Sequence, residues 1–146
     1  MDSLAVNLLR KRILLRAGLA TVGTFLFNTL GVWLSLYSMI WWYDMPMHFA
    51  GGLFTALLIF VFLLRFSKFA NLDNLKSILI VLFLTLIIGL LWEGYEIVFD
   101  IIAGRKHIFI DSLSDIFFDF AGGIQACFIY MRHKNKLTPT SSQNSL

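Results

Sequence analysis

Four long apolar stretches constrain this chain more than any other feature of its sequence. A helix of about 20 residues crosses a bilayer core of about 30 Å, and residues 17–40 contain no charged residue. Comparable stretches cover residues 46–65, 76–103 and 112–131. Soluble domains carry about 25% charged residues, whereas this chain is 14% charged and 58% hydrophobic. The sequence therefore predicts an all-α membrane protein built as a four-transmembrane-helix bundle.

The basic residues predict the orientation of this bundle. Ten of the twelve Lys and Arg residues fall in the N-terminal segment, the connection after residue 64 and the C-terminal segment: Arg10, Lys11, Arg12, Arg16, Arg65, Lys68, Lys76, Arg132, Lys134 and Lys136. Because cytoplasmic loops carry the excess of Lys and Arg, both termini are predicted to be cytoplasmic. We divide the chain into a basic cytoplasmic N-terminus (1–16), a four-helix transmembrane domain (17–131) and a disordered, polar cytoplasmic tail (132–146). The net charge of +3 comes from these flanks and does not indicate nucleic-acid binding.

The acidic residues gather toward the opposite end of the bundle. Seven of the nine acids fall there, namely Asp44, Glu93, Glu96, Asp100, Asp111, Asp115 and Asp119, together with His48. Their spacings of three and four residues put each set on one stripe of its helix. Carboxylates inside a membrane are costly and are usually paired or functional. We therefore expect a shared polar pocket beneath the outer surface.

A repeated motif links the second and fourth stretches. Residues 44–52 read DMPMHFAGG and residues 115–123 read DIFFDFAGG. The paired glycines, each followed four residues later by a small residue, favour close packing of two membrane helices. A stripe of small and polar residues in 17–40 predicts a similar packing seam. The chain is thus predicted to contain two pseudo-repeated helical hairpins.

The four residues that no local role explains are Glu93, Glu96, Asp119 and His48, and they are the candidates for catalytic or metal-binding groups. A histidine among carboxylates suits a divalent ion such as Mg, Mn, Fe or Zn. Sharing of protons and pairing with basic groups remain open alternatives. The candidates for a substrate-binding rim are Asp44, Asp100, Asp115, Arg105 and Lys106.

Two of these rim residues also have simpler explanations. Asp44 precedes Pro46 and can cap the second helix. Ser112 and Asp115 fit a capping box at the start of the fourth helix.

The segments WYDMPMHFAGG (42–52), WEGYEIVFD (92–100) and DSLSDIFFDFAGG (111–123) resemble the VanZ-like and YjdF-like small membrane proteins. The resemblance covers roughly residues 42–126. It implies a compact multi-span bundle with a polar outer pocket in a bacterial inner membrane. VanZ-like members favour Gln and Asn where this chain has Glu96 and Asp119, which moves it closer to the YjdF-like group.

Three functions fit these observations. The first is a divalent-metal-assisted site for an envelope lipid or lipid-linked headgroup, in which Arg105 and Lys106 meet phosphate. The second is a small proton- or cation-coupled carrier, which would need a homodimer because four spans make a narrow pathway. The third is a non-catalytic membrane assembly protein whose polar network only specifies packing. All three have membrane lipids as partners, and the sequence does not decide whether the protein is an enzyme.

Overall fold

The computed structural model describes residues 1–105 and 109–137. Its six helices are α1 (Ser3–Trp33), α2 (Leu36–Met39), α3 (Asp44–Leu63), α4 (Ser67–Ala70), α5 (Asn74–Ile102) and α6 (Phe109–Leu137). Four of them, α1, α3, α5 and α6, are long and apolar enough to cross a membrane. The described residues contain no strand, so the predicted all-α fold with four spans is confirmed.

The ends of α1 and α5 follow from local capping. The Asp2 side chain accepts a hydrogen bond from the Ala5 amide at 2.7 Å, so α1 begins well before residue 17. It ends at Trp33 rather than near residue 40, because Ser35 adopts a left-handed conformation with φ of 56° and turns the chain. Helix α5 is capped by Asp73 and ends at Ile102, shortly before Gly104, which adopts a left-handed conformation with φ of 66°.

Both capping explanations for the acidic residues are wrong. Asp44 lies inside the first turn of α3, and the N-cap of this helix is Tyr43, whose side chain makes no cap hydrogen bond. Helix α6 begins at Phe109, so Ser112 and Asp115 lie within it and both are buried. The same helix continues to Leu137, so residues 132–137 are helical where the sequence predicted a disordered tail. Residues 138–146 lie outside the described part of the chain.

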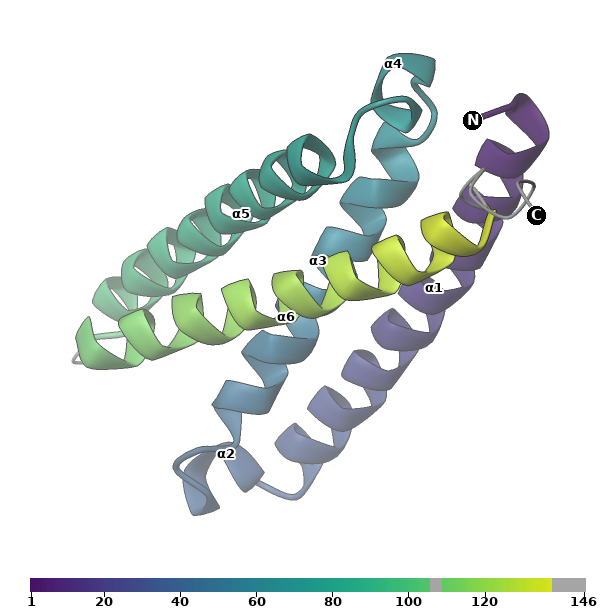
Figure 1. Cartoon of the computed structure of the whole chain (residues 1–146). Coiled ribbons are helices and arrows are strands. Elements are labelled where there is room, and N and C mark those ends of the chain that lie inside the picture. The colour runs from purple at the N-terminus through teal and green to yellow at the C-terminus, as the bar shows by residue number, and fades with distance from the viewer. Residues whose placement is uncertain (106–108, 138–146) are drawn as a thin grey trace.

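The four long helices form two antiparallel hairpins, α1 with α3 and α5 with α6 (Figure 1). Helices α3 and α6 cross at the centre of the molecule and make the most extensive contact between any two helices described. A Cβ added at Gly52 would overlap the Asp119 carbonyl, and one at Gly122 would overlap the Phe49 carbonyl. The two glycine motifs therefore let the helix backbones touch, as predicted.

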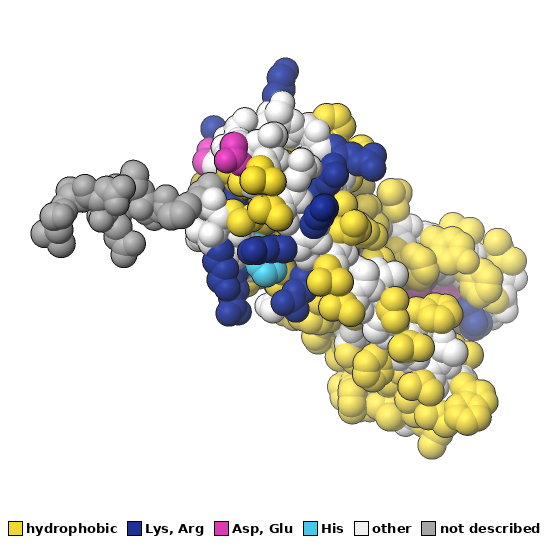
Figure 2. All heavy atoms as spheres, turned by 90° about the vertical axis from the view of Figure 1, so that its right-hand side faces the viewer, with side chains coloured by type: hydrophobic (Ala, Val, Ile, Leu, Met, Phe, Trp, Pro, Cys, Tyr) yellow, Lys and Arg dark blue, Asp and Glu magenta, His cyan; other side chains and the backbone are white. Residues whose placement is uncertain are grey.

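The two ends of the bundle have opposite character. At one end, the Met1 amino group donates to Asn71 Oδ1 at 3.0 Å and Lys134 Nζ donates to the Leu72 carbonyl at 2.9 Å. Figure 2 looks onto this end, where Lys and Arg side chains gather, with mainly hydrophobic side chains beyond it. The buried core lies toward this half, where the rings of Phe60 and Tyr130 stack at 4.1 Å. The polar site occupies the other half.

Candidate metal centre

His48 is the centre of the polar site. It lies one turn into α3 and only 7% of its surface is exposed. Its Nε2 atom lies 3.8 Å from Asp44 Oδ2, one turn earlier on the same helix, and 3.8 Å from Asp115 Oδ2 of α6. Its Nδ1 atom faces the other way and lies 3.5 Å from Asp119 Oδ1. The imidazole therefore stands between carboxylates on both sides.

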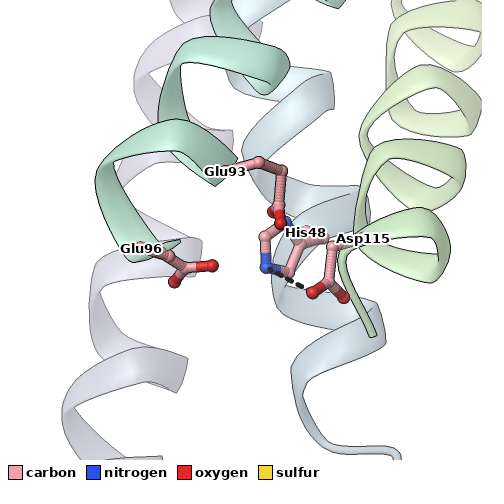
Figure 3. A group of neighbouring side chains, drawn as sticks. All are labelled: His48, Glu93, Glu96 and Asp115. Atoms are coloured by element: carbon pink, nitrogen blue, oxygen red, sulfur yellow. Dashed lines mark ion pairs between the residues drawn. The ribbon is translucent and has the colours of Figure 1, made fainter. Parts of the chain in front are cut away.

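Helix α5 contributes two further carboxylates to this site. The ligand atoms of His48, Glu93, Glu96 and Asp115 all lie within 4.8 Å of one another (Figure 3). Glu93 and Glu96 come from α5, Asp115 comes from α6 and His48 comes from α3. The i, i+3 spacing of the two glutamates brings both onto the face of α5 that meets the histidine. Three helices thus supply one group of potential metal ligands.

Glu93 is the most unusual member of this group. The residue is 4% exposed, yet neither carboxylate oxygen has a hydrogen-bond partner among the described residues. Buried polar groups in proteins are almost always hydrogen-bonded, and a buried charge is normally paired or bound to a metal. In Figure 3 the Glu93 side chain points at the His48 ring. The site therefore contains an unpartnered carboxylate directed into a cluster of other ligands.

One predicted ligand lies outside the group of four, and one predicted rim residue lies within it. Asp119 was predicted to be a central ligand but does not belong to the group of four. Asp115 was predicted to lie at the rim and does belong to this group. The reason is the helix crossing. Asp119 lies at the contact between α3 and α6, with its carboxylate beside Gly51 and Gly89. It therefore contacts the Nδ1 side of His48, while Asp115, one turn earlier, faces Nε2.

The predicted rim residues surround a polar cavity of about 350 Å³, which we call the vestibule. Asp44, Asp100, Asp115 and Arg105 all line it. The Arg105 Nε donates to Asp100 Oδ1 at 2.9 Å, and its guanidinium carbon lies 5.2 Å from the centre of the Phe99 ring. Lys106 lies outside the described residues. The vestibule opens onto Glu96 and Asp115, so it gives access to the candidate ligands.

A second cavity, of about 680 Å³, lies on the other side of the cluster between α1 and α5. We call it the groove. Thr21, Thr24 and Asn28 of α1 line it, so this part of the predicted packing seam faces a cavity instead of a helix. Gly31, from the same seam, does pack closely, against the Tyr43 ring.

Tyr37 lines the groove beside Asn28 and is a residue that sequence reasoning missed. Its hydroxyl donates to Asn28 Oδ1 at 2.6 Å. Partial burial, followed by the charge of Asp44, raises the pKa of Tyr37 to about 12, so this hydroxyl keeps its proton. The only signal in the sequence was an aromatic residue nine positions after an intramembrane Asn, which is too weak to assign a contact.

Comparison with protein families places the whole bundle in one group. The family described as "Predicted membrane protein (DUF2238)" matches residues 6–136, which include nearly the whole of the four long helices and every ligand of the candidate centre. The chain belongs to this family. The match extends well beyond residues 42–126, on which the resemblance to VanZ-like and YjdF-like proteins rested, and it does not carry either of those names. No curated protein and no solved structure matches the chain.

Proposed function

We propose that this membrane protein binds a divalent cation through His48, Glu93, Glu96 and Asp115, and uses it to hold or activate a lipid or lipid-linked headgroup. The observation that carries the proposal is Glu93, whose buried oxygens lack hydrogen-bond partners in the described structure and point into the cluster. One imidazole with three carboxylates is a donor set that suits Mn, Fe, Zn or Mg. A cation supplies the partner that these oxygens lack.

The electrostatics of the cluster support the same reading. Two unit charges 4.8 Å apart repel by about 3.5 kcal/mol at an effective dielectric constant of about 20. Three carboxylates share this space, so the folded chain holds several such repulsions together. A divalent cation bound between the carboxylates attracts each of them and so offsets their mutual repulsion. Metal–ligand bonds of about 2.0–2.2 Å hold the ligand atoms of a tetrahedral site about 3.3–3.6 Å apart. Ligand atoms within 4.8 Å of one another would therefore have to approach each other by up to about 1.5 Å to bind one ion.

The surroundings of His48 resemble those of a metal-binding histidine. Such residues usually place one ring nitrogen on the metal and the other against a carboxylate, which fixes the ring orientation. Here Asp119 faces Nδ1, while Nε2 faces Asp115. In this proposal Asp119 orients the imidazole and does not bind the ion, and Nε2 is the ligand atom.

The position of the site supports a headgroup as its ligand. The acids lie at the end of the bundle opposite the basic end. The positive-inside rule assigns this acidic end to the outer face of the membrane. We propose that the membrane is a bacterial inner membrane. A cation at this level meets headgroups at the bilayer surface through the vestibule. It would act there as a Lewis acid that polarises a phosphoryl or carbonyl oxygen. Arg105, which lines the vestibule, is the nearest described cation for a phosphate.

Metal analysis of the purified protein tests this proposal. The protein in detergent is stripped with a chelator, equilibrated with Mn²⁺ or Zn²⁺ and washed, and bound metal is counted by mass spectrometry. We expect about one ion per chain in the wild type and in Asp111→Asn, an exposed acid outside the cluster. We expect a loss of at least tenfold in affinity in Glu93→Gln, because a neutral amide of the same shape replaces a charged ligand.

Two results would overturn the proposal. If the wild type binds no more metal than Glu93→Gln, the cluster is a packing network, as in a non-catalytic assembly protein. If it binds no metal but moves protons or cations across vesicle membranes in a Glu93-dependent manner, the carrier function applies.

A further inference from the structure

The groove between α1 and α5 is a large feature that metal binding does not explain. Both helices pack on α3, but they hardly contact each other. The space between them has a volume of about 680 Å³, within the ~300–1,000 Å³ typical of ligand pockets. Its floor is α3, which contributes Gly51 and Thr55 to the lining.

The walls of the groove are less polar than their residue types indicate. Thr21 and Thr24 donate their hydroxyl protons to carbonyls one turn earlier on α1, at 2.9 and 2.8 Å. Thr85 does the same on α5, at 2.8 Å. Because these hydroxyl protons are used within their own helices, the walls offer methyl groups and need no polar occupant. Phe25, Phe54 and Ile88 add apolar surface.

The groove is one leaflet long and has one polar end. It extends along α1 from Thr21 to Val32, which is about 16 Å at 1.5 Å per residue. That is close to half of the ~30 Å hydrocarbon thickness. Asp44, His48 and Glu96 line the same cavity, so its polar end is continuous with the candidate metal centre. An amphiphile in the groove would therefore meet the ion with its head.

The surface of α1 next to the groove is apolar and exposed in the isolated chain. Leu19, Val22 and Leu26, on the neighbouring faces of α1, are 60%, 58% and 54% exposed, as expected for a helix surrounded by lipid. A gap between two spans at this depth is filled from the hydrocarbon of the membrane. A second protein helix is a poorer fit, because a 16 Å length of helix about 10 Å wide has a volume of roughly 1,250 Å³.

We propose that the groove binds one acyl chain of a phospholipid, which enters sideways from the bilayer and places its phosphate-bearing headgroup at the metal centre. The assignment of the headgroup rests on the proposed function, whereas binding of the chain does not. Asp44 and Glu96 line both the groove and the vestibule, so the ion lies between a lipid-facing opening and a polar one. The substrate class of the site is thus a bilayer phospholipid rather than a water-soluble phosphate.

Variants that fill the groove test this proposal. Thr24→Trp places an indole in the groove, and Leu26→Trp places the same ring on the nearby lipid-facing surface. Thr21→Trp is a second groove variant, at an exposed position outside the buried core. Each protein is purified in detergent and titrated with dioleoyl phosphatidylglycerol, and bound lipid is counted by native mass spectrometry. A parallel titration uses glycerol phosphate, which carries the phosphate without the chains.

We expect the wild type and Leu26→Trp to hold one phospholipid per chain, and both groove variants to bind it at least about tenfold more weakly, because the indole displaces several methylene groups. Glycerol phosphate should not compete at the same concentration. Equal lipid binding in all four proteins would overturn the proposal. So would a lipid-free wild-type dimer that Thr24→Trp converts to a monomer, because the groove would then seat a second copy of the chain.

Metal content separates this test from that of the proposed function. The groove variants leave the four ligands unchanged, so they should bind Mn²⁺ like the wild type. If the wild type binds no metal but loses its lipid in the groove variants, the metal site fails and the acyl-chain site stands. If metal binds and the lipid count never changes, the acyl-chain site fails and the metal site stands.

Discussion

Replacement of Glu93 by glutamine should have opposite effects on stability with and without metal. Glutamine keeps the shape of the side chain and removes its charge. In the metal-free protein this deletes repulsions with Glu96 and Asp115, each about 3.5 kcal/mol at 4.8 Å. The attraction between Glu93 and a protonated His48 is lost as well, and this loss offsets the relief of about one of the two repulsions. We therefore expect Glu93→Gln to be about 3.5 kcal/mol more stable than the wild type when a chelator is present.

Added metal should close or reverse this difference. A ligand at a thousand times its Kd stabilises the protein that binds it by about 4.1 kcal/mol. For a chain of about 150 residues each kcal/mol moves the Tm by roughly 2–4 °C. The wild type should therefore melt about 8–16 °C higher in this concentration of Mn²⁺ than in chelator, and Glu93→Gln should change by much less.

Tryptophan fluorescence during heating in detergent measures both effects. Asp111→Asn is the matched control, since it removes one acid from the same end of the bundle and lies outside the cluster. It should melt and respond to Mn²⁺ like the wild type. The reasoning is refuted if Glu93→Gln melts below the wild type in chelator, or if it gains as much from Mn²⁺.

Three further predictions concern the scaffold of the site. Gly122→Ala should lower the free energy of unfolding by about 1–3 kcal/mol, because the added Cβ meets the backbone of α3. Gly94→Ala should not lower it, because a Cβ there has nothing within 4 Å. Thermal melts compare the two variants. Lys134→Met should lower the free energy of unfolding by about 1–3 kcal/mol, because the Leu72 carbonyl loses its hydrogen-bond donor. Thermal melts of Lys136→Met, a change at an exposed position, should match those of the wild type. A hydrogen bond from the Lys76 amide, in the first turn of α5, lowers the pKa of Asp73 below its usual 3.8. The cap therefore stabilises α5 above that pH and is lost as the pH falls through the lowered value. Amides at the start of α5 should then lose protection, measured relative to their intrinsic exchange rate at each pH, with no such pH step in Asp73→Asn.

The sequence was sufficient for the bundle because its signals are local. Apolar length alone defined the four spans, and the FAGG repeats predicted the close crossing of α3 and α6 at Gly52 and Gly122. The helix ends were less predictable. Asp2 caps the start of α1 within a basic segment, and the left-handed conformation of Ser35 ends the helix. Hydropathy therefore predicted the wrong residue for both ends of α1.

The different positions of Asp115 and Asp119 relative to the cluster could not be predicted from residue spacing. Both residues lie on one stripe of α6, four residues apart, so periodicity treats them alike. Which one reaches the cluster depends on the register of the crossing, and that register follows from the backbone contact at Gly52. The groove could not be predicted from the sequence either. The gap between α1 and α5 depends on how each helix packs against α3, which residue spacing does not determine.

The measurement that tests the central claim most directly is anomalous X-ray scattering from crystals grown with Mn²⁺. We predict one strong peak inside the bundle, bonded to the imidazole of His48 and to carboxylate oxygens of Glu93, Glu96 and Asp115. Asp119 should lie on the far side of the imidazole, within reach of Nδ1. A peak confined to exposed acids such as Asp111, or a bundle in which these four side chains lie apart with no metal between them, would contradict it.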